Sequence, residues 1–300
     1  MKEIEFIKMA GTGNDYIFID CMEGMGPDLV PDDIAKLSNR KTGIGSDGLI
    51  KIIPSDKGIA KMKMWNSDGS SSRMCGNALR CIGLYIFKKF GERSFLLESD
   101  TGTHRTEILK NKGDYEAMVE VEIGRPFFQA DQIPFLPDRA GVNISSEDTC
   151  ISIPLHLENI PHVDSENLSG LRATLVSVGN PHCVIFVKDA HHFPVREVGS
   201  YIETHPSFPE RTNVEFVTKK SDGTLFQRTY ERGAGETDAC GSGACAVLAA
   251  SVLENRGPAK NSIELLGGIL EVEWDRSADT IFLRGSAREI FRGSFSMASF

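Results

Sequence analysis

Alternating apolar and polar positions divide the first part of the chain into short segments separated by turn residues. Residues 4–20, IEFIKMAGTGNDYIFID, place a Gly-Asn-Asp turn between two such segments, which predicts strand, loop and strand. Apolar residues at helical spacing predict a short helix within 30–40 and a longer one within 74–91, which Gly91 should end. Further strands are expected within 41–54, 60–70 and 115–126.

The pattern then weakens and resumes. Residues 127–171 give a weak signal, in which 151–163 indicates short strands broken by proline. Residues 172–187 again predict strand, Gly-Asn turn and strand, and a helix within 240–257 should end at Gly257. The other predicted elements are a helix within 195–206, strands within 211–219 and 224–233, and hairpin-like strands within 262–274 and 280–295.

Matching residues recur at a nearly constant spacing in the two parts. Cys75 and Cys240 each precede a glycine at the start of a predicted helix. Asn66 and Glu231 lie nine residues before these cysteines, each at the end of a predicted strand, so their separation equals that of the cysteines. Asn14 and Asn180, each after a glycine, are separated by one residue more. Several matches in the same order predict two pseudo-repeated domains of mixed α and β content.

The two cysteines occupy a position that changes the chemistry of a thiol. The first N–H groups of a helix have no partner within the helix and carry partial positive charge, so they stabilise a thiolate and bind carboxylates. We therefore expect the pKa of Cys75 and Cys240 to be lowered from about 8.5 toward neutrality. The small residues after each cysteine let a ligand approach the backbone closely.

Two such thiols on opposite sides of one ligand suit the inversion of a carbon next to a carboxylate. One thiolate would remove the α-proton from one face, and the other thiol would deliver a proton to the opposite face. The helix N–H groups would stabilise the negative charge that develops on the carboxylate. The repeat therefore predicts a two-base racemase or epimerase.

Composition and charge narrow the classes of partner. The net charge of −9 and the pI of about 5.4 argue against a nucleic-acid surface. No apolar stretch approaches the roughly 18 residues of a membrane span, and the opening residues do not resemble a signal peptide. Seven scattered cysteines indicate a reducing compartment, so we expect a cytoplasmic protein.

Other interpretations of the same residues explain less of the pattern. A lone buried cysteine is usually a packing residue, which is what we expect of Cys81 and Cys245 inside the two helices. The cysteine spacings do not fit a zinc site, and the glycine-rich segments match neither nucleotide-binding fingerprint. A Cys–His hydrolase would leave the second cysteine unexplained.

Several motifs resemble those of the diaminopimelate epimerases, a family of cofactor-independent amino-acid racemases. They are KMAGTGNDYIFID, GIGSDGLI, NSDGSSSRMCGNALRC, VEIGRP, VSVGNPHCVIFV, RTNVEF and ERGAGETDACGSGACA. The resemblance covers most of the chain except residues from about 127 to 171. It implies an α+β fold of two pseudo-symmetric domains, each a curved, mostly antiparallel sheet around a central helix. The expected domains are 1–126 with a returning strand at about 287–300, and 127–286, with the active site in the cleft between them.

The resemblance also implies roles for individual residues. Cys75 and Cys240 correspond to the two bases, and His182 and Glu231 occupy positions that support them. The expected carboxylate-binding residues are Gly76, Asn77, Gly241 and Ser242, with Asn14 nearby. The residues expected at the distal amino-acid end are Asn66, Asn180, Asn213, Glu231 and Arg232. No cofactor and no metal are implied, the partner is a small amino acid, and a homodimer is compatible with the family.

Three positions depart from the family's usual pattern, namely Ala10, Ser71 and Gly48. The residues expected at the distal end are intact, which favours epimerisation of LL- and meso-diaminopimelate in lysine and cell-wall precursor synthesis. The alternatives are a racemase of another polar amino acid such as histidine or ornithine, and a non-catalytic amino-acid-binding protein. A proline racemase would leave Asn213, Glu231 and Arg232 without a ligand group, and an isomerase like those of phenazine pathways would not need the second cysteine.

Overall fold

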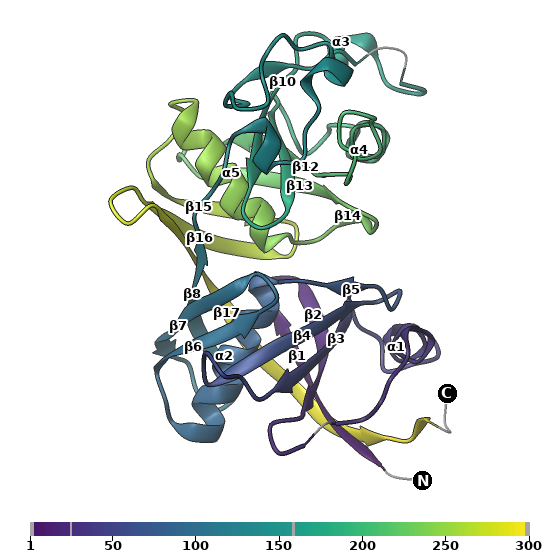
Figure 1. The fold of residues 1–300 in the computed structure, drawn as a ribbon, viewed down its shortest axis with the longest axis vertical. Coiled ribbons are helices and arrows are strands. Elements are labelled where there is room, and N and C mark those ends of the chain that lie inside the picture. The colour runs from purple at the N-terminus through teal and green to yellow at the C-terminus, as the bar shows by residue number, and fades with distance from the viewer. Residues whose placement is uncertain (1–2, 25, 158–159, 298–300) are drawn as a thin grey trace. The chain divides into compact units, whose positions relative to one another are not determined.

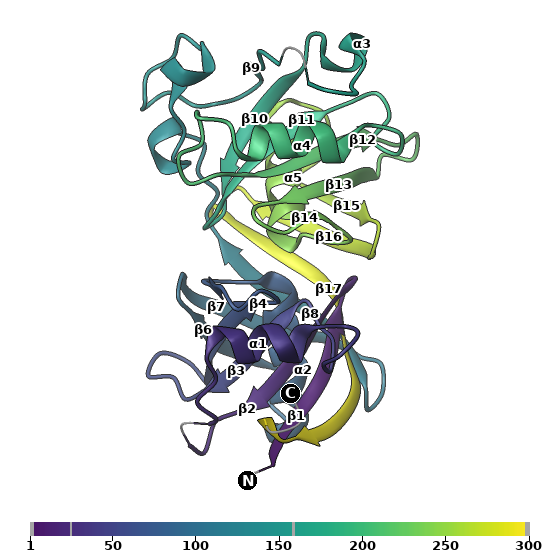
Figure 2. The same ribbon diagram turned by 90° about the vertical axis from the view of Figure 1, so that its right-hand side faces the viewer.

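The computed structural model describes residues 3–24, 26–157 and 160–297. The chain divides into two compact units (Figures 1 and 2). Unit 1 comprises residues 1–122 and 284–300, and unit 2 comprises residues 123–283. Among the described residues, no helix is both long and apolar enough to cross a membrane.

Unit 1 is a closed ring of strands. Strand β1 pairs with β2 and with the chain's last strand, and β2 continues in parallel to β3. The ring proceeds through β4, β6, β7 and β8, and β8 closes it by pairing with β17. The strands are β1 (Ile4–Gly11), β2 (Asn14–Asp20), β3 (Gly48–Ile53), β4 (Ala60–Asn66), β5 (Ser71–Ser72), β6 (Ser94–Ser99), β7 (Gly102–Asn111), β8 (Glu116–Gly124) and β17 (Thr280–Phe295).

Helix α2 (Gly76–Phe90) fills the centre of this ring (Figure 1). Every residue from Gly76 to Ile86 is buried, because the helix packs against strands such as β1 and β7. It ends at Gly91, whose φ of 76° is the left-handed conformation that glycine adopts without strain. Helix α1 (Pro31–Ser38) lies outside the ring and packs on β3 (Figure 2).

Unit 2 repeats this arrangement. Strand β10 pairs with β9 and β11, and the sheet continues through β12, β13, β15 and β16, with β14 beside β13. Helix α5 (Gly241–Leu253) contacts most of these strands, while α4 (Val195–Glu203) packs on β13. The strands are β9 (Ile153–Pro154), β10 (Arg172–Ser177), β11 (Pro181–Phe186), β12 (Asn213–Lys219), β13 (Leu225–Glu231), β14 (Gly235–Thr237), β15 (Lys260–Leu265) and β16 (Gly268–Asp275).

The composition of α5 explains how it fits inside its sheet. It is rich in alanine, glycine and serine and has no charged residue, and a helix that is apolar on all sides is stable only when it is fully surrounded. Ala244, Leu248 and the residues between them are completely buried. Small side chains keep the helix thin, so the strands can curve closely around it.

The two units share their strand register as well as their topology. β4 and β13 both end nine residues before a cysteine, at Asn66 and Glu231, and α2 and α5 both begin directly after one. The parallel pair β2–β3 corresponds to β11–β12, with a helix in each connection. The predicted α+β fold of two repeated domains, each with a curved sheet around a helix, is confirmed.

Three features of the structure differ from what the sequence predicts. The strands β6 and β7 were not predicted, although their alternating burial is typical of strands. Residues 280–295 form one long strand and not a hairpin, because neither glycine within it makes a turn. Helix α5 ends before Glu254, and Asn255 with a φ of 55° takes the left-handed position expected of Gly257.

The weakly patterned region contains little regular structure. It has two 3-10 turns, η1 (Ala130–Gln132) and η2 (Pro137–Ala140), the short strand β9 and the single-turn helix α3 (Ser165–Leu168). Of the strands expected within 151–163, the structure shows β9 alone among the described residues, and 158–159 lie outside them. Apolar side chains such as Ile133, Phe135 and Ile160 bind this region to the core of unit 2.

Gly199 of α4 tests how tightly that helix packs on β13. A Cβ atom at this position would lie 2.5 Å from the Cβ of Tyr230, which belongs to the sheet and cannot easily move. We expect Gly199→Ala to lower the free energy of unfolding by about 1–3 kcal/mol, despite the better helix propensity of alanine. Urea unfolding measures this change. Glu197→Ala, on the exposed side of the same helix, should change it by less than about 0.5 kcal/mol, and equal stability of the two variants would contradict the packing.

Candidate functional site

Cys75 and Cys240 are the N-cap residues of the two central helices. Both have extended backbone conformations, with φ and ψ of −146° and 117° at Cys75 and of −124° and 108° at Cys240. The helices begin at Gly76 and Gly241, so the first unpaired N–H groups belong to the residues that directly follow each thiol. Because the neighbouring residue is glycine, it has no side chain to come between these N–H groups and a small anion.

Polar side chains of β2 and of α2 lie near Cys75, which is half-buried. The hydroxyl of Tyr16 on β2 lies 3.2 Å from the Cys75 Sγ. Asn77 Nδ2 donates to Asn14 Oδ1 at 2.5 Å, and Asn77 Oδ1 accepts from the buried Arg80 at 2.8 Å. The structure therefore brings together Cys75, Asn14, Gly76 and Asn77, as the sequence predicts.

A charged cluster fixes the strand end that carries Asn14. Asn14 Nδ2 donates to Asp47 Oδ2 at 3.3 Å, and Arg40 donates to Asp47 Oδ1 at 2.8 Å. Burial alone would raise the pKa of Asp15, but hydrogen bonds and charge from Arg40 and Lys8 hold it below its usual value. The turn between β1 and β2 is thus held by ionised groups.

Asn66 belongs to the turn that follows β4. It is exposed at the end of β4, and its Nδ2 donates to Ser70 Oγ at 3.0 Å. The side chain and the backbone N–H of Ser70 also donate hydrogen bonds to the Asp68 carboxylate, which lower the pKa of Asp68. Asn66 thus begins the turn that leads from β4 to the short strand β5, ahead of Cys75 in the chain.

Cys240 is more deeply buried than Cys75, with 5% of its surface exposed. Its Sγ accepts from the N–H of Gly243 at 3.4 Å and lies 3.5 Å from the Ser242 Oγ. Burial raises the pKa of Cys240 well above its ordinary value, and the charges of Glu231 and Glu215 raise it further, against the Ser242 and Gly243 hydrogen bonds. The expectation of a lowered pKa is therefore wrong for Cys240, because loss of water outweighs the helix terminus.

A buried histidine–carboxylate pair lies beneath Cys240. The side chains of His182 and Glu215 are 0% exposed, and His182 Nδ1 lies 2.8 Å from Glu215 Oε1. His182 Nε2 lies 3.0 Å from Asn180 Oδ1, and Asn180 Nδ2 donates to Ser242 Oγ at 3.4 Å. Polar contacts thus continue from Glu215 to the hydroxyl beside the Cys240 sulfur.

Glu231 approaches Cys240 from the end of β13. Burial raises the pKa of the Glu231 carboxyl, although hydrogen bonds from Thr237 and from Cys240 act to lower it. The Thr237 Oγ1 donates to Glu231 Oε1 at 2.5 Å. A carboxyl group in contact with the thiol can accept its proton or repel its charge, so it is placed to affect the acidity of Cys240.

A hydrogen bond between the Asn213 side chain and the Arg232 backbone joins these two residues. Asn213 is buried, donates from Nδ2 to the Pro181 carbonyl at 2.9 Å and accepts the Arg232 N–H at 3.0 Å. The Arg232 guanidinium is on the surface and donates to the Glu210 carbonyl at 3.0 Å. The Asn213 amide is therefore already engaged, whereas most of the Arg232 guanidinium is available to a ligand.

Two residues of this site were not predicted from the sequence. Tyr16 looks like one more aromatic residue in an apolar strand, and nothing in YIFID shows that its hydroxyl meets a sulfur. Glu215 offered a signal, since it is an acidic residue between apolar neighbours in the segment VEFV of β12. A carboxylate at a fully buried strand position requires a partner, which here is His182.

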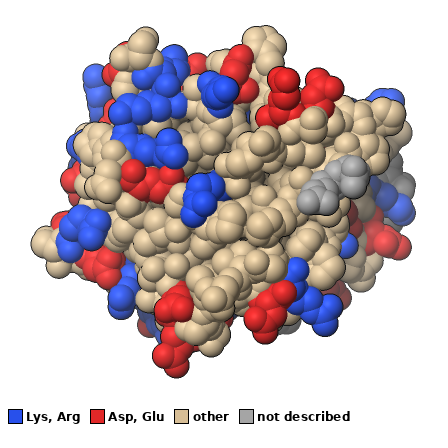
Figure 3. Space-filling view, turned by 90° about the horizontal axis from the view of Figure 1, so that it is seen from above, with Lys and Arg blue, Asp and Glu red and all other residues tan. Residues whose placement is uncertain are grey.

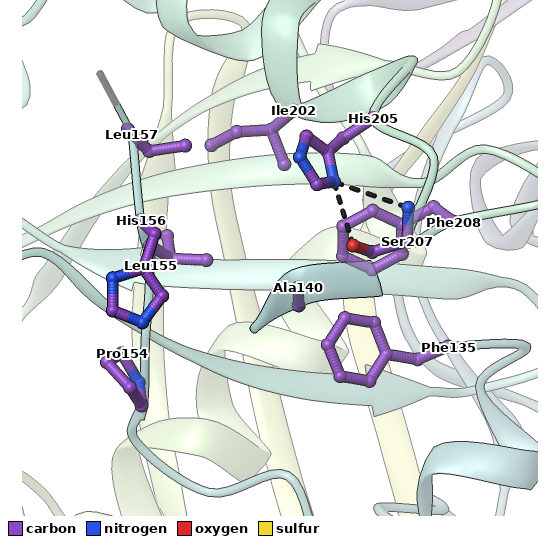
Figure 4. Close-up of a pocket in the computed structure, with 10 residues that line it drawn as sticks. All are labelled: Phe135, Ala140, Pro154, Leu155, His156, Leu157, Ile202, His205, Ser207 and Phe208. Atoms are coloured by element: carbon purple, nitrogen blue, oxygen red, sulfur yellow. Dashed lines mark hydrogen bonds between the residues drawn. The ribbon is translucent and has the colours of Figure 1, made fainter. Parts of the chain in front are cut away.

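Two further features of the described residues concern where a metal or a ligand could bind. Within the described part of the chain, no three His, Cys, Asp or Glu side chains are grouped so that they could hold a metal ion. Figure 4 shows a hollow in unit 2 between Phe135, Leu155 and Phe208, with His205 donating or accepting at 2.8 Å from Ser207 Oγ. Burial lowers the pKa of His205, and the hollow contains neither cysteine.

Known proteins share both the sequence and the fold of this chain. The family model described as diaminopimelate epimerase matches residues 6–128 and 174–290, and the break coincides with the weakly patterned region. The diaminopimelate epimerase of Methanococcus maripaludis strain C6 is 39% identical over 299 residues, covering 98% of this chain and 100% of its own. That of Leptospira biflexa is 40% identical over 293 residues, covering 97% and 98%.

Solved structures with low sequence identity support the fold alone. A predicted epimerase from Pseudomonas aeruginosa has a TM-score of 0.70 at 14% identity, covering 97% of this chain and 99% of its own. A hydroxyproline epimerase from Agrobacterium vitis, with bound trans-4-hydroxy-L-proline, has a TM-score of 0.68 at 14% identity and covers 98% and 91%. From the family match and the nearly full-length relatives, the chain belongs to the diaminopimelate epimerase family.

Proposed function

We propose that the chain is an isomerase that interconverts LL- and meso-diaminopimelate without a cofactor, with Cys75 and Cys240 as the two bases. The observation that carries this proposal is the repeated placement of a cysteine at the N-cap of each central helix. Membership of the diaminopimelate epimerase family supports the substrate. The proposal requires both helix starts to face one substrate.

Proton transfer follows from the two thiols. One cysteine, as thiolate, takes the α-proton; the C–H bond breaks, an S–H bond forms, and the electron pair moves into the substrate carboxylate. The opposite cysteine then gives its S–H proton to the other face of the same carbon, which inverts the centre. Each turnover leaves the thiol and thiolate exchanged, so the reverse reaction uses the same groups in opposite roles.

The helix starts supply the charge stabilisation for this step. The N–H groups at Gly76, Asn77, Gly241 and Ser242 are assigned to the substrate α-carboxylate. Asn14 adds a side chain to this group, because Asn77 donates to its Oδ1 and leaves the two amides side by side. Preorganised N–H donors stabilise a carboxylate more strongly as its negative charge grows in the transition state.

The distal amino-acid end of the substrate is assigned to polar groups of both units. These are Asn66, Asn180, Asn213, Glu231 and Arg232. When the substrate's distal ammonium and carboxylate lose their hydrogen bonds to water, the protein must replace them. A carboxylate can pair with the ammonium, and a guanidinium and amides can bind the carboxylate. The exposed guanidinium of Arg232 and the exposed amide of Asn66 are suited to this role, while Asn213 holds the backbone of Arg232 in place.

His182 and Glu231 are assigned to the support of Cys240. Glu231 is in hydrogen-bond contact with the thiol and raises its pKa. His182 acts at a distance, because it holds the Asn180 amide that donates to Ser242. Glu231 thus keeps the sulfur protonated, and His182 keeps the Ser242 hydroxyl beside it oriented, until the thiol releases or receives a proton.

A second candidate function is the racemisation of another polar amino acid. Ala10 and Ser71 favour this alternative, since they depart from the usual residues of the family. Ser71 is exposed at the start of β5, and Ala10 is partly exposed near the end of β1. Either side chain could alter which amino acid is accepted without changing the cysteines.

The assigned partner is a small amino acid, and we propose a cytoplasmic enzyme, for which a homodimer is a compatible assembly. On the face drawn in Figure 3, acidic and basic side chains lie among a larger uncharged surface. Together with the net charge of −9, this favours a small-molecule partner over nucleic acid.

The first test is hydrogen exchange at the α-carbon. In deuterium oxide and without added cofactor, the purified chain should incorporate deuterium into LL-diaminopimelate and convert it to the meso isomer, because the thiol protons equilibrate with solvent. Mass spectrometry and chiral chromatography measure both. Exchange with histidine or ornithine but not with diaminopimelate would contradict the lead proposal and favour the alternative.

Cysteine variants separate an enzyme from a binding protein. Cys75→Ala and Cys240→Ala should each lower the epimerisation rate by at least about 10²–10⁴-fold, the usual contribution of an acid–base group. Cys245→Ala is the matched control, since Cys245 lies in the same helix as the Cys240 cap and is fully buried. Unchanged function in all three variants would contradict a two-base enzyme.

The Glu215–His182 pair predicts a separate effect on stability and on Cys240. Glu215→Gln removes a buried negative charge that faces His182, so we expect the free energy of unfolding to fall by about 1–3 kcal/mol. The same charge raises the pKa of Cys240, so its removal should move alkylation of Cys240 to lower pH. Urea unfolding and site-resolved alkylation measure the two effects.

Glu254 offers a matched control for this variant. Its carboxylate accepts from Thr174 Oγ1 at 2.7 Å and from Arg256 Nε at 2.7 Å, near the far end of α5. Glu254→Gln should therefore leave the alkylation profile of Cys240 in place. If Glu215→Gln behaves in both measurements like Glu254→Gln, the His182 pair does not act on the thiol.

A further inference from the structure

The thiol of Cys75 has a neighbour that the proposed roles do not use. Tyr16 lies on β2 with 3% of its surface exposed, and its hydroxyl is 3.2 Å from the Cys75 Sγ. Its ring packs edge-on against Phe18, with the ring centroids 6.2 Å apart and an angle of 87° between the planes. Burial and this packing fix the ring, so the hydroxyl is held at the sulfur and is not free to turn away.

The repeat shows that the strand position of Tyr16 has an equivalent in unit 2. In the parallel pair of unit 1, Tyr16 is opposite Gly48, and in that of unit 2, His182 is opposite Asn213. Gly48 and Asn213 each begin their strand, and the interval between them along the chain equals the interval between the two cysteines. Tyr16 therefore takes in unit 1 the strand position that His182 takes in unit 2.

The chemistry at these matched positions differs. A phenol hydroxyl has one proton to donate and lone pairs to accept, so it can donate to a thiolate and accept from a thiol. The same contact thus serves Cys75 in both of its states. A hydrogen bond to the charged form favours that form, so a donor at the sulfur makes the thiolate easier to generate.

We propose that Tyr16 is a catalytic residue that donates a hydrogen bond to the Cys75 thiolate and sets the basicity of this thiol. The inference rests on the proposed function for its catalytic meaning, although the contact itself does not. It implies that the two bases are controlled by unlike groups. Cys75 is controlled by a phenol in direct contact, and Cys240 by a carboxyl group and a histidine acting through Asn180 and Ser242.

The test measures the Cys75 pKa directly. The rate of Cys75 alkylation by iodoacetamide, resolved by mass spectrometry of the full chain, is followed against pH. Tyr16→Phe keeps the ring and removes the hydroxyl, so the Cys75 pKa should rise by about one unit, with about tenfold slower alkylation below the pKa. The epimerisation kcat should fall by a similar factor, with a smaller change in KM.

Tyr85→Phe is the matched control. Tyr85 is another buried tyrosine of unit 1, and its hydroxyl bonds to Asp20 and not to a cysteine. This variant loses a comparable hydroxyl and should leave the Cys75 alkylation profile unchanged. An equal shift in the Tyr16→Phe and Tyr85→Phe variants would overturn the proposal, because the effect would then come from a general loosening of unit 1.

A second substitution distinguishes hydrogen bonding from packing. Placing 3-fluorotyrosine at position 16 keeps the shape and makes the hydroxyl a stronger donor, so the Cys75 pKa should fall instead of rise. An unchanged Cys75 pKa in both the Tyr16→Phe and the fluorotyrosine proteins would overturn the inference, whatever the activity. If the unaltered chain exchanges no α-proton of any tested amino acid while both pKa shifts occur, the proposed function fails and the Tyr16 contact stands.

Discussion

The site depends on one constraint, namely that each central helix begins at a cysteine while the rest of the helix is enclosed by strands. A surrounded helix must satisfy its polar ends locally, and its first N–H groups have no partner in the helix. Glycine at the first helical position keeps those groups open, and the preceding cysteine places a thiol next to them. The proposed function therefore assigns anion binding and proton transfer to the same place in both units.

The shared backbone carries unlike chemistry in its two copies. Around Cys75, the groups are a phenol, two asparagines and a buried arginine, and the residue is half-buried. Around Cys240, burial dominates, two carboxylates raise the thiol pKa, and a histidine sits below. An epimerase acting on two different stereoisomers has no reason to keep its two bases alike, since each must be matched to a different face and a different proton donor.

The sequence predicts the repeated backbone positions of the site better than the burial and the side-chain contacts within it. The constant spacing of the repeat places both cysteines, both strand ends and both helix starts correctly, because the repeat fixes backbone register. The repeat does not show that the Cys240 thiol is buried away from solvent, since its burial depends on strands from the whole unit. The roles of Tyr16 and Glu215 were missed for the same reason, because a contact between β2 and α2, or between β11 and β12, is invisible along the chain. The helix end at Asn255 differs from the predicted Gly257 because asparagine also tolerates the left-handed conformation.

The central claim is that Cys75 and Cys240 act on opposite faces of one carbon. Mild oxidation of the full chain with diamide, followed by alkylation, proteolysis and mass spectrometry without reductant, tests this most directly. The account predicts a Cys75–Cys240 disulfide and a loss of epimerase activity that dithiothreitol reverses, because sulfurs that flank one carbon can meet when the substrate is absent. Full oxidation that leaves both cysteines open to alkylation would contradict it.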